Sequence, residues 1–288
     1  MRKNVLNSPR LLELKKKRRK IFLKKVSIYL VVLTIIFAGL AYLSRLPSVN
    51  ITSIEITGNK VLDSDGLKSV VSDELTGNYF LIFPKTNIFL YSKNSIKKHL
   101  LGKFKRLKDV KFSLVDKRIL SVSISERAPD YVWCGAQIPE MKPDTEAPAC
   151  YFLDDSGYIF DEAPYFSGDV YFKFYGSVYL EGDTPIGSYF APGIFSKFLT
   201  LKEELDNMTL RPVALLVEED GVIKFLLSGL NNTMPEIILK TDLDFESALG
   251  NLQSALDTDP LKSEFKNKYS SLEYIDLRFG NRVYYRFK

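Results

Sequence analysis

The chain has 288 residues, of which 45% are hydrophobic, and a formal net charge of +5 with an isoelectric point near 8.9. The basic excess lies in the first 25 residues, which hold eleven Lys and Arg against one acid, so the remainder carries a net charge of about −5. This distribution argues against nucleic-acid binding, and the hydrophobic content is ample for packed cores. The length beyond the basic tail suggests two domains.

Residues 26–45 are predicted to form a single transmembrane helix. The run from Val26 to Leu43 contains no charged residue. As a helix it extends about 27 Å, close to the roughly 30 Å hydrocarbon core of a bilayer. By the positive-inside rule, the basic tail of residues 1–25 stays in the cytoplasm. The sequence therefore predicts a single-pass protein of the plasma membrane whose domains are exported.

A cleavable signal peptide is the alternative interpretation of the same segment. The tripeptide Gly39-Leu40-Ala41 loosely resembles a small-x-small cleavage site. However, the basic region is long for a signal peptide, and the apolar run exceeds the usual core of about 7 to 15 residues. An uncleaved anchor is therefore favoured.

Residues 49–127 are predicted to form a domain with the element order β-α-α-β-β. The stretch VNITSIEIT alternates apolar and polar residues and ends at a Gly-Asn turn, which indicates a strand. A helix is expected to begin at Asp63 or Ser64 and to end at Gly77. The other expected elements are an unusually apolar loop, NYFLIFPKTNIFLYS, a second helix from about 94 to 101, and two strands, 110–114 and 120–124, joined by a turn.

Residues 128–288 are predicted to form a mostly antiparallel β domain with covering helices, so that the fold class is α+β. The strongest signals are a hairpin about Asp220-Gly221, a helix that starts at Asp244, and a last hairpin about Gly280-Asn281. That hairpin leaves residues 282–287 as a terminal strand. Further expected elements are a strand at 169–175, a helix at 192–205 and a strand at 235–241.

The two cysteines, Cys134 and Cys150, bracket a loop rich in proline and polar residues. They lack the further ligands that a zinc site needs, so no metal is expected there. A disulfide bond between them would close a loop of about 15 residues and stabilise the fold by roughly 3 kcal/mol. Two reduced, buried thiols are the alternative.

Several stretches, taken in order, resemble the FtsQ/DivIB family of bitopic cell-division proteins. They are ITSIEITGNK, a segment ending in TGNYF, VKFSLVDKRILSVSISERAP, CYFLDDSGYIF and SLEYIDLRFGNRVYYRFK. The resemblance implies a polypeptide-transport-associated (POTRA) domain over residues 49–127, followed by a β-rich domain. It also implies a non-enzymatic scaffold of the divisome, which acts in bacterial cell division and septum formation. The chain departs from the family at two places. The DKRIL turn lacks the proline that the family often has there, and the loop between the two cysteines looks like an insertion.

The terminal strand is the expected partner-binding element. A terminal strand commonly lies at a sheet edge, where unpaired backbone groups can accept a partner strand. The resemblance implies coiled-coil partners of the FtsB/FtsL type at this edge. The partner-binding residues that we expect are Arg278, Phe279, Val283, Tyr284, Tyr285 and Phe287. In this interpretation Phe279 and the tyrosines are apolar anchors, and Arg278 pairs with an acidic partner residue. A plain core strand is the alternative.

Signals for an enzyme are weak. The chain has no P-loop, Rossmann glycine pattern, GxSxG elbow or HExxH motif. Its single histidine, His99, is expected on a helix surface, and the acid pairs Asp154-Asp155 and Glu203-Glu204 are expected to be solvated. No catalytic residue, cofactor, nucleic acid or small-molecule substrate is therefore expected. A membrane-anchored envelope hydrolase and a POTRA-type chaperone or transport module remain as alternatives.

Overall fold

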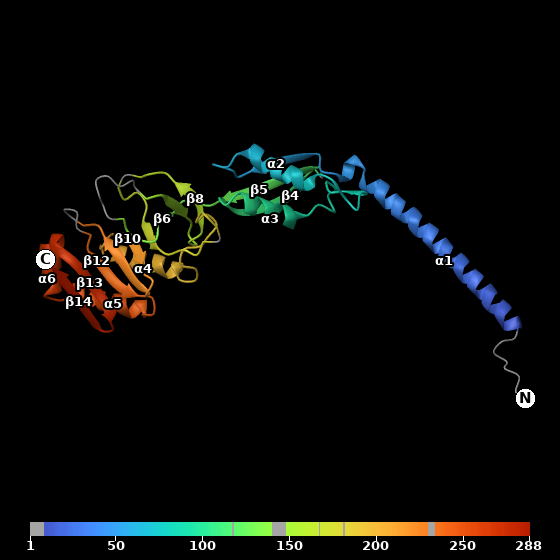
Figure 1. The fold of residues 1–288 in the computed structure, drawn as a ribbon. Helices are drawn as coiled ribbons and strands as arrows, with labels where there is room; N and C mark the ends of the chain where they lie inside the picture. The colour runs from blue at the N-terminus through green and yellow to red at the C-terminus, as the bar shows by residue number, and fades with distance from the viewer. Residues whose placement is uncertain (1–8, 117, 140–147, 167, 181, 230–233) are drawn as a thin grey trace, which may run out of the picture. The chain divides into compact units, whose positions relative to one another are not determined.

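The computed structural model describes residues 9–116, 118–139, 148–166, 168–180, 182–229 and 234–288. The chain divides into two compact units, Met1–Ser125 and Glu126–Lys288. Both combine helices with β-sheet, and a large sheet dominates the second unit (Figure 1). The mixed α+β class predicted from the sequence is confirmed.

Helix α1 (Pro9–Ser44) contains the whole apolar run and continues into the basic tail. Its described side chains are almost all exposed, including the Leu, Ile and Val residues of the run. It is long and apolar enough to cross a membrane. Because an apolar helix that is not packed inside a protein needs another apolar environment, the exposure favours a membrane span over a core helix.

The rest of the first unit is built around a three-stranded sheet in the order β1-β5-β4, in which β1 and β5 are parallel. Helices α2 and α3 pack against each other, and α2 also contacts β1. The elements after α1 are a 3-10 turn (Pro47–Val49), β1 (Ser53–Thr57), α2 (Ser64–Leu75), β2 (Asn78–Tyr79), β3 (Phe83–Pro84), α3 (Lys93–Lys103), β4 (Leu107–Val115) and β5 (Ile119–Glu126).

Local signals explain several of these boundaries. The Asp63 side chain caps α2 by accepting a hydrogen bond from the backbone N–H of Gly66 at 2.8 Å, and Ser92 caps α3 in the same way. Gly58, with φ of +87°, ends the first strand where a Cβ atom would lie 2.3 Å from the carbonyl oxygen of Ile124. Only glycine fits so close to the neighbouring strand.

The structure differs from the sequence prediction at two places in this unit. The first strand begins at Ser53 rather than Val49, because proline starts a 3-10 turn over Pro47–Val49. The apolar loop before α3 contains a short hairpin, β2–β3, in which Tyr79 lies opposite Phe83. Two-residue strands are too short to show a periodic pattern, so this hairpin could not be predicted from periodicity.

The second unit contains a nine-stranded sheet in the order β14-β13-β12-β11-β10-β9-β6-β7-β8. Five neighbouring pairs are antiparallel and three are parallel. Its strands are β6 (Tyr131–Trp133), β7 (Cys150–Leu153), β8 (Ile159–Ala163), β9 (Lys173–Gly176), β10 (Pro212–Val217), β11 (Val222–Leu227), β12 (Glu236–Lys240), β13 (Leu272–Phe279) and β14 (Arg282–Phe287). Its helices are α4 (Phe195–Asn207), α5 (Phe245–Leu256), α6 (Leu261–Lys268) and a 3-10 turn, Tyr269–Ser271.

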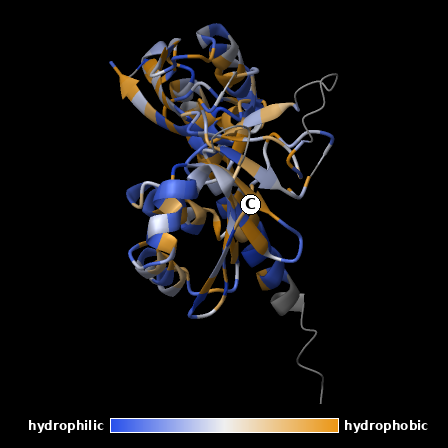
Figure 2. Cartoon of the chain, turned by 90° about the vertical axis from the view of Figure 1, so that its left-hand side faces the viewer, coloured by the Kyte–Doolittle hydropathy of each residue, from blue (hydrophilic) through white to orange (hydrophobic). Residues whose placement is uncertain are grey.

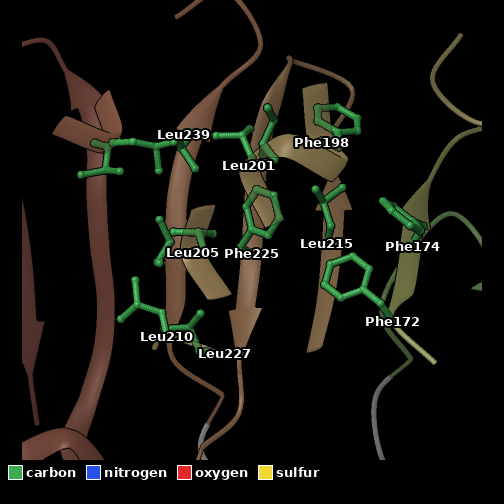
Figure 3. Close-up of a cluster of buried hydrophobic side chains, with 14 of the residues drawn as sticks. Phe172, Phe174, Phe198, Leu201, Leu205, Leu210, Leu215, Phe225, Leu227 and Leu239 are labelled. Atoms are coloured by element: carbon green, nitrogen blue, oxygen red, sulfur yellow. The ribbon is translucent and has the colours of Figure 1, made fainter. Parts of the chain in front are cut away.

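Helices α4 and α5 cover the sheet and close its main core. Side chains of α4 such as Leu201 and Leu205 meet Leu215 and Phe225 of the central strands in one buried cluster (Figure 3). Hydrophobic and hydrophilic residues are interleaved along the ribbon (Figure 2), and a second buried cluster, which includes Val132, Phe152 and Leu226, lies on the same sheet. The short, polar helix α6 was not predicted, because Leu261 is its one buried residue.

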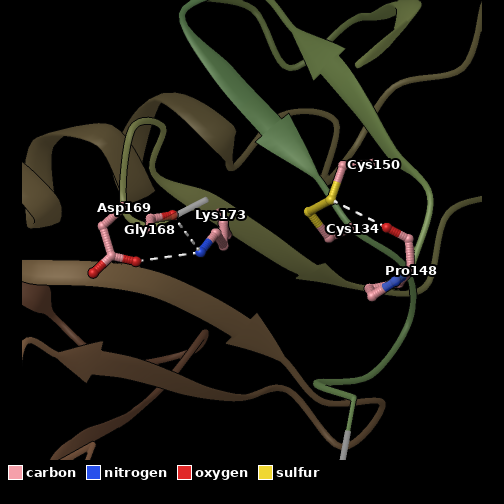
Figure 4. The surroundings of a disulfide bond; sticks show 6 residues. All are labelled: Cys134, Pro148, Cys150, Gly168, Asp169 and Lys173. Atoms are coloured by element: carbon pink, nitrogen blue, oxygen red, sulfur yellow. Dashed lines mark hydrogen bonds and ion pairs between the residues drawn. A yellow bond between two sulfur atoms is a disulfide. The ribbon is translucent and has the colours of Figure 1, made fainter. Parts of the chain in front are cut away.

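Cys134 and Cys150 form a disulfide bond, with the sulfur atoms 2.02 Å apart (Figure 4). Strands β6 and β7 are antiparallel neighbours, and Trp133 lies opposite Tyr151. This register brings the two cysteines together at the ends of the strands. The chain between them is the proline-rich loop, whose residues 140–147 lie outside the described part of the structure.

Candidate protein-binding edge

Strand β14 occupies one end of the nine-stranded sheet, with β13 as its neighbour among the described strands. The two strands form a hairpin whose turn contains Gly280 with φ of +64°. The side-chain amide of Asn251, on α5, donates a hydrogen bond to the carbonyl oxygen of Gly280 at 3.2 Å. The hairpin is therefore held by a covering helix, and no strand in the described part of the chain pairs with its outer side.

Side chains alternate across β14, so its two faces differ. Val283, Tyr285 and Phe287 are partly buried and pack against the main core. Tyr284 and the arginines on either side of it are exposed. The two tyrosines therefore differ: the ring of Tyr285 is engaged in the core, as are the side chains of Val283 and Phe287, whereas the ring of Tyr284 is exposed.

The backbone of β14 points its N–H groups in alternate directions. The N–H of Lys288 donates to the carbonyl oxygen of Ser271, which precedes β13, at 2.8 Å. The two register shifts of this pair place the extra residues in β13, between Leu272 and Tyr274 and between Asp276 and Phe279. The N–H groups of β14 therefore alternate in direction along the whole strand. The N–H groups of Tyr284 and Arg286 therefore face β13, and those of Val283, Tyr285 and Phe287 face the outer edge.

Two aromatic rings lie exposed beside this edge. The side chains of Phe279 and Tyr284 are 56% and 46% exposed, and their ring centroids are 5.2 Å apart in an edge-to-face arrangement. One comes from β13 and the other from β14, so the pair is fixed by the hairpin. Exposed aromatic side chains on a rigid element are the kind that anchor protein interfaces.

Arg278 has an acidic partner within its own strand. Its Nε and Nη2 donate to the two carboxylate oxygens of buried Asp276 at 2.9 and 2.7 Å. These hydrogen bonds raise the pKa of the Arg278 guanidinium. We expected Arg278 to be available for an acidic partner, but much of its charge is already balanced. Sequence analysis missed Asp276, although its spacing of two residues from Arg278 on a strand places both on one face.

The structure also locates the acidic residues considered for catalysis. Glu203 and Glu204 are exposed on α4, whereas Asp154 is buried, which corrects the expectation that it is solvated. Its carboxylate accepts hydrogen bonds from Ser156 and from the backbone N–H of Tyr158, and it forms an ion pair with Arg127. Burial raises the pKa of Asp154, but these hydrogen bonds outweigh it and leave the pKa below its usual value.

Asp154 therefore has a structural role that accounts for its burial. The guanidinium of Arg127 also lies over the ring of Tyr158, with its carbon 4.1 Å from the ring centroid. His99, the other titratable residue considered, is exposed on α3, where its Nδ1 lies 3.2 Å from Glu74. Across the described ranges, no three His, Cys, Asp or Glu residues are grouped so that they could hold a metal ion.

These features define a class: a mixed α+β protein with an apolar N-terminal helix and an exposed edge strand near its C-terminus. In comparisons with known proteins, no protein-family model and no curated protein matches the chain.

Proposed function

We propose that this protein is a membrane-anchored, non-enzymatic scaffold of the bacterial divisome, similar to the FtsQ/DivIB proteins. It recruits coiled-coil division proteins of the FtsB/FtsL type by adding a partner strand along β14. The observation that carries the proposal is the edge itself, where the N–H groups of Val283, Tyr285 and Phe287 point outward beside the exposed pair Phe279 and Tyr284.

The first unit supports the same proposal. Its main elements follow the order β-α-α-β-β that the family resemblance implies for a POTRA domain, with the β2–β3 hairpin as an addition. Helix α1 precedes that domain directly and has the length and composition of a membrane span. On this basis we propose that residues 49–127 form a POTRA domain and residues 26–45 the membrane anchor.

The topology gives a direct prediction. A reporter fused after Lys288 should be active outside the cytoplasm, because the basic residues before Val26 keep the N-terminus inside. The measurement uses paired fusions to alkaline phosphatase and to a fluorescent protein that matures only in the cytoplasm. Fluorescence from the C-terminal fusion would contradict the orientation.

The scaffold function is tested in dividing cells. A fluorescent protein on the cytoplasmic N-terminus should concentrate at the division septum. A photo-crosslinking residue at Tyr284 should capture a membrane protein with a coiled-coil exported segment, because this side chain lies beside the binding edge. The captured protein is identified by mass spectrometry.

A crosslinker at Tyr179 is the matched control, since this tyrosine is exposed and lies outside the hairpin. Capture of the same protein with equal yield from both positions would remove β14 as the binding site. An even distribution of the fusion around the cell would contradict a role in division.

A further inference from the structure

Three large apolar side chains of the first unit are exposed in a part of the chain that the proposed scaffold function does not use. Phe80 and Leu81 form the tip of the β2–β3 hairpin and are 89% and 88% exposed, and Phe89, in the turn that follows, is 80% exposed. Leaving such side chains in water is unfavourable, and grouped exposure commonly marks a surface that is covered in the working protein.

This hairpin lies against the C-terminal part of α1. The ring of Phe83 packs edge-on against Phe37, with centroids 5.5 Å apart, and the Asn87 side chain donates to the carbonyl oxygen of Ser44 at 3.0 Å. Arg45 Nε donates to the carbonyl oxygen of Ile82 at 3.2 Å. Phe37 lies six residues before the end of the apolar run, which is about 9 Å along a helix. The hairpin therefore runs beside the outer end of the proposed span.

The backbone at the tip supports a role beyond a plain turn. Phe80 and Leu81 have φ angles of 49° and 62°. Large side chains are uncommon in this left-handed region, which costs about 1 to 2 kcal/mol per residue, and glycine or asparagine would relieve the strain. Two bulky apolar residues at strained positions indicate that the side chains themselves are needed at the tip.

We propose that Phe80, Leu81 and Phe89 insert into the outer leaflet of the membrane and form a second lipid contact beside α1. This inference rests on the proposed membrane anchoring. A lipid surface fits better than a protein because the hairpin that carries Phe80 and Leu81 packs against α1 within its apolar run, near exposed Tyr42. Residues 49–125 contain thirteen Lys and Arg against seven Asp and Glu, a balance that anionic headgroups attract.

The experiment uses the full-length protein with its native disulfide and one added cysteine for a nitrobenzoxadiazole label. The labelled variants are Leu81→Cys and Phe89→Cys for the lipid contact, and Leu33→Cys for the span. Each is reconstituted in vesicles of phosphatidylcholine and phosphatidylglycerol, with or without brominated acyl chains. Brominated lipid should cause a loss of emission at all three positions, since bromine quenches fluorophores inside the bilayer.

Val61→Cys is the matched control. Val61 is an exposed apolar residue of the same unit, and it follows β1 in the sequence, outside the β2–β3 hairpin. Its emission should not change. If the label at residue 33 is quenched but the labels at residues 81 and 89, like that at residue 61, are not, the lipid contact is wrong and the anchor stands. Absence of quenching at residue 33 would overturn both. Shielding of residues 81 and 89 only in native membranes would assign the surface to a protein partner instead.

Discussion

Replacement of Tyr285 by proline is expected to weaken partner binding about tenfold or more while the second unit stays folded. Proline removes the outward N–H of residue 285 and places its ring where a partner strand would approach. One lost hydrogen bond accounts for roughly 0.5 to 1.5 kcal/mol, and the steric block adds to it. Binding is measured by calorimetry with the captured partner, and folding by circular dichroism.

Tyr285→Ala is the matched control, because it removes the core-facing ring but retains the N–H. It should lose some stability and bind nearly as well as the parent. Tyr284→Pro should instead destabilise the hairpin, since the N–H of Tyr284 faces β13. If folded Tyr285→Pro binds as tightly as the parent, strand addition at β14 is wrong and the partner uses another surface.

Removal of the Asp154 carboxylate is expected to lower the free energy of unfolding of the second unit by about 3 to 5 kcal/mol. Asp154→Ala removes a buried carboxylate together with its ion pair to Arg127 and its hydrogen bonds from Ser156 and the backbone N–H of Tyr158. Urea titration followed by the fluorescence of Trp133 measures the change. Asp155→Ala, at the exposed neighbouring position, is the control and should change stability little.

The same carboxylate sets a pH dependence. Because the pKa of Asp154 is lower in the folded protein than its usual value, its contribution is complete above about pH 4 and is lost as the pH falls through the folded-state pKa. The parent should therefore lose stability on acidification, and Asp154→Ala should lose less. An identical acid-induced loss in the two proteins would assign the effect to other groups.

The sequence predicted the elements that carry a complete local signal. The cap at Asp63, the apolar stripe of α5 and the glycine turn before β14 each specify their element without help from distant residues. The nine-stranded order was not predictable, because it depends on parallel pairs such as β12–β13 that join segments far apart in the chain.

At the candidate edge, too, the strand was predictable from local sequence, whereas the orientation of its side chains and N–H groups was not. The alternation in Arg282–Phe287 predicted the strand, but both faces of that strand carry an aromatic residue. Only the covering helix α5 and the register with β13 decide that Tyr285 turns inward and that its N–H turns outward. The ion pair of Arg127 with Asp154 was equally hidden, since 27 positions separate the two residues.

The charges of β14 have a consequence for self-association. An uncovered edge strand invites an identical strand from a second copy, which is the usual route from an open sheet to dimers and fibres. Arg282 and Lys288 lie at the two ends of this edge and carry positive charge, whereas the charge of Arg286 is balanced by an ion pair with Glu273 of β13. In antiparallel pairing of two copies, these charges would lie across from one another and repel. Like charges at the two ends of β14 therefore discourage homotypic pairing of this edge.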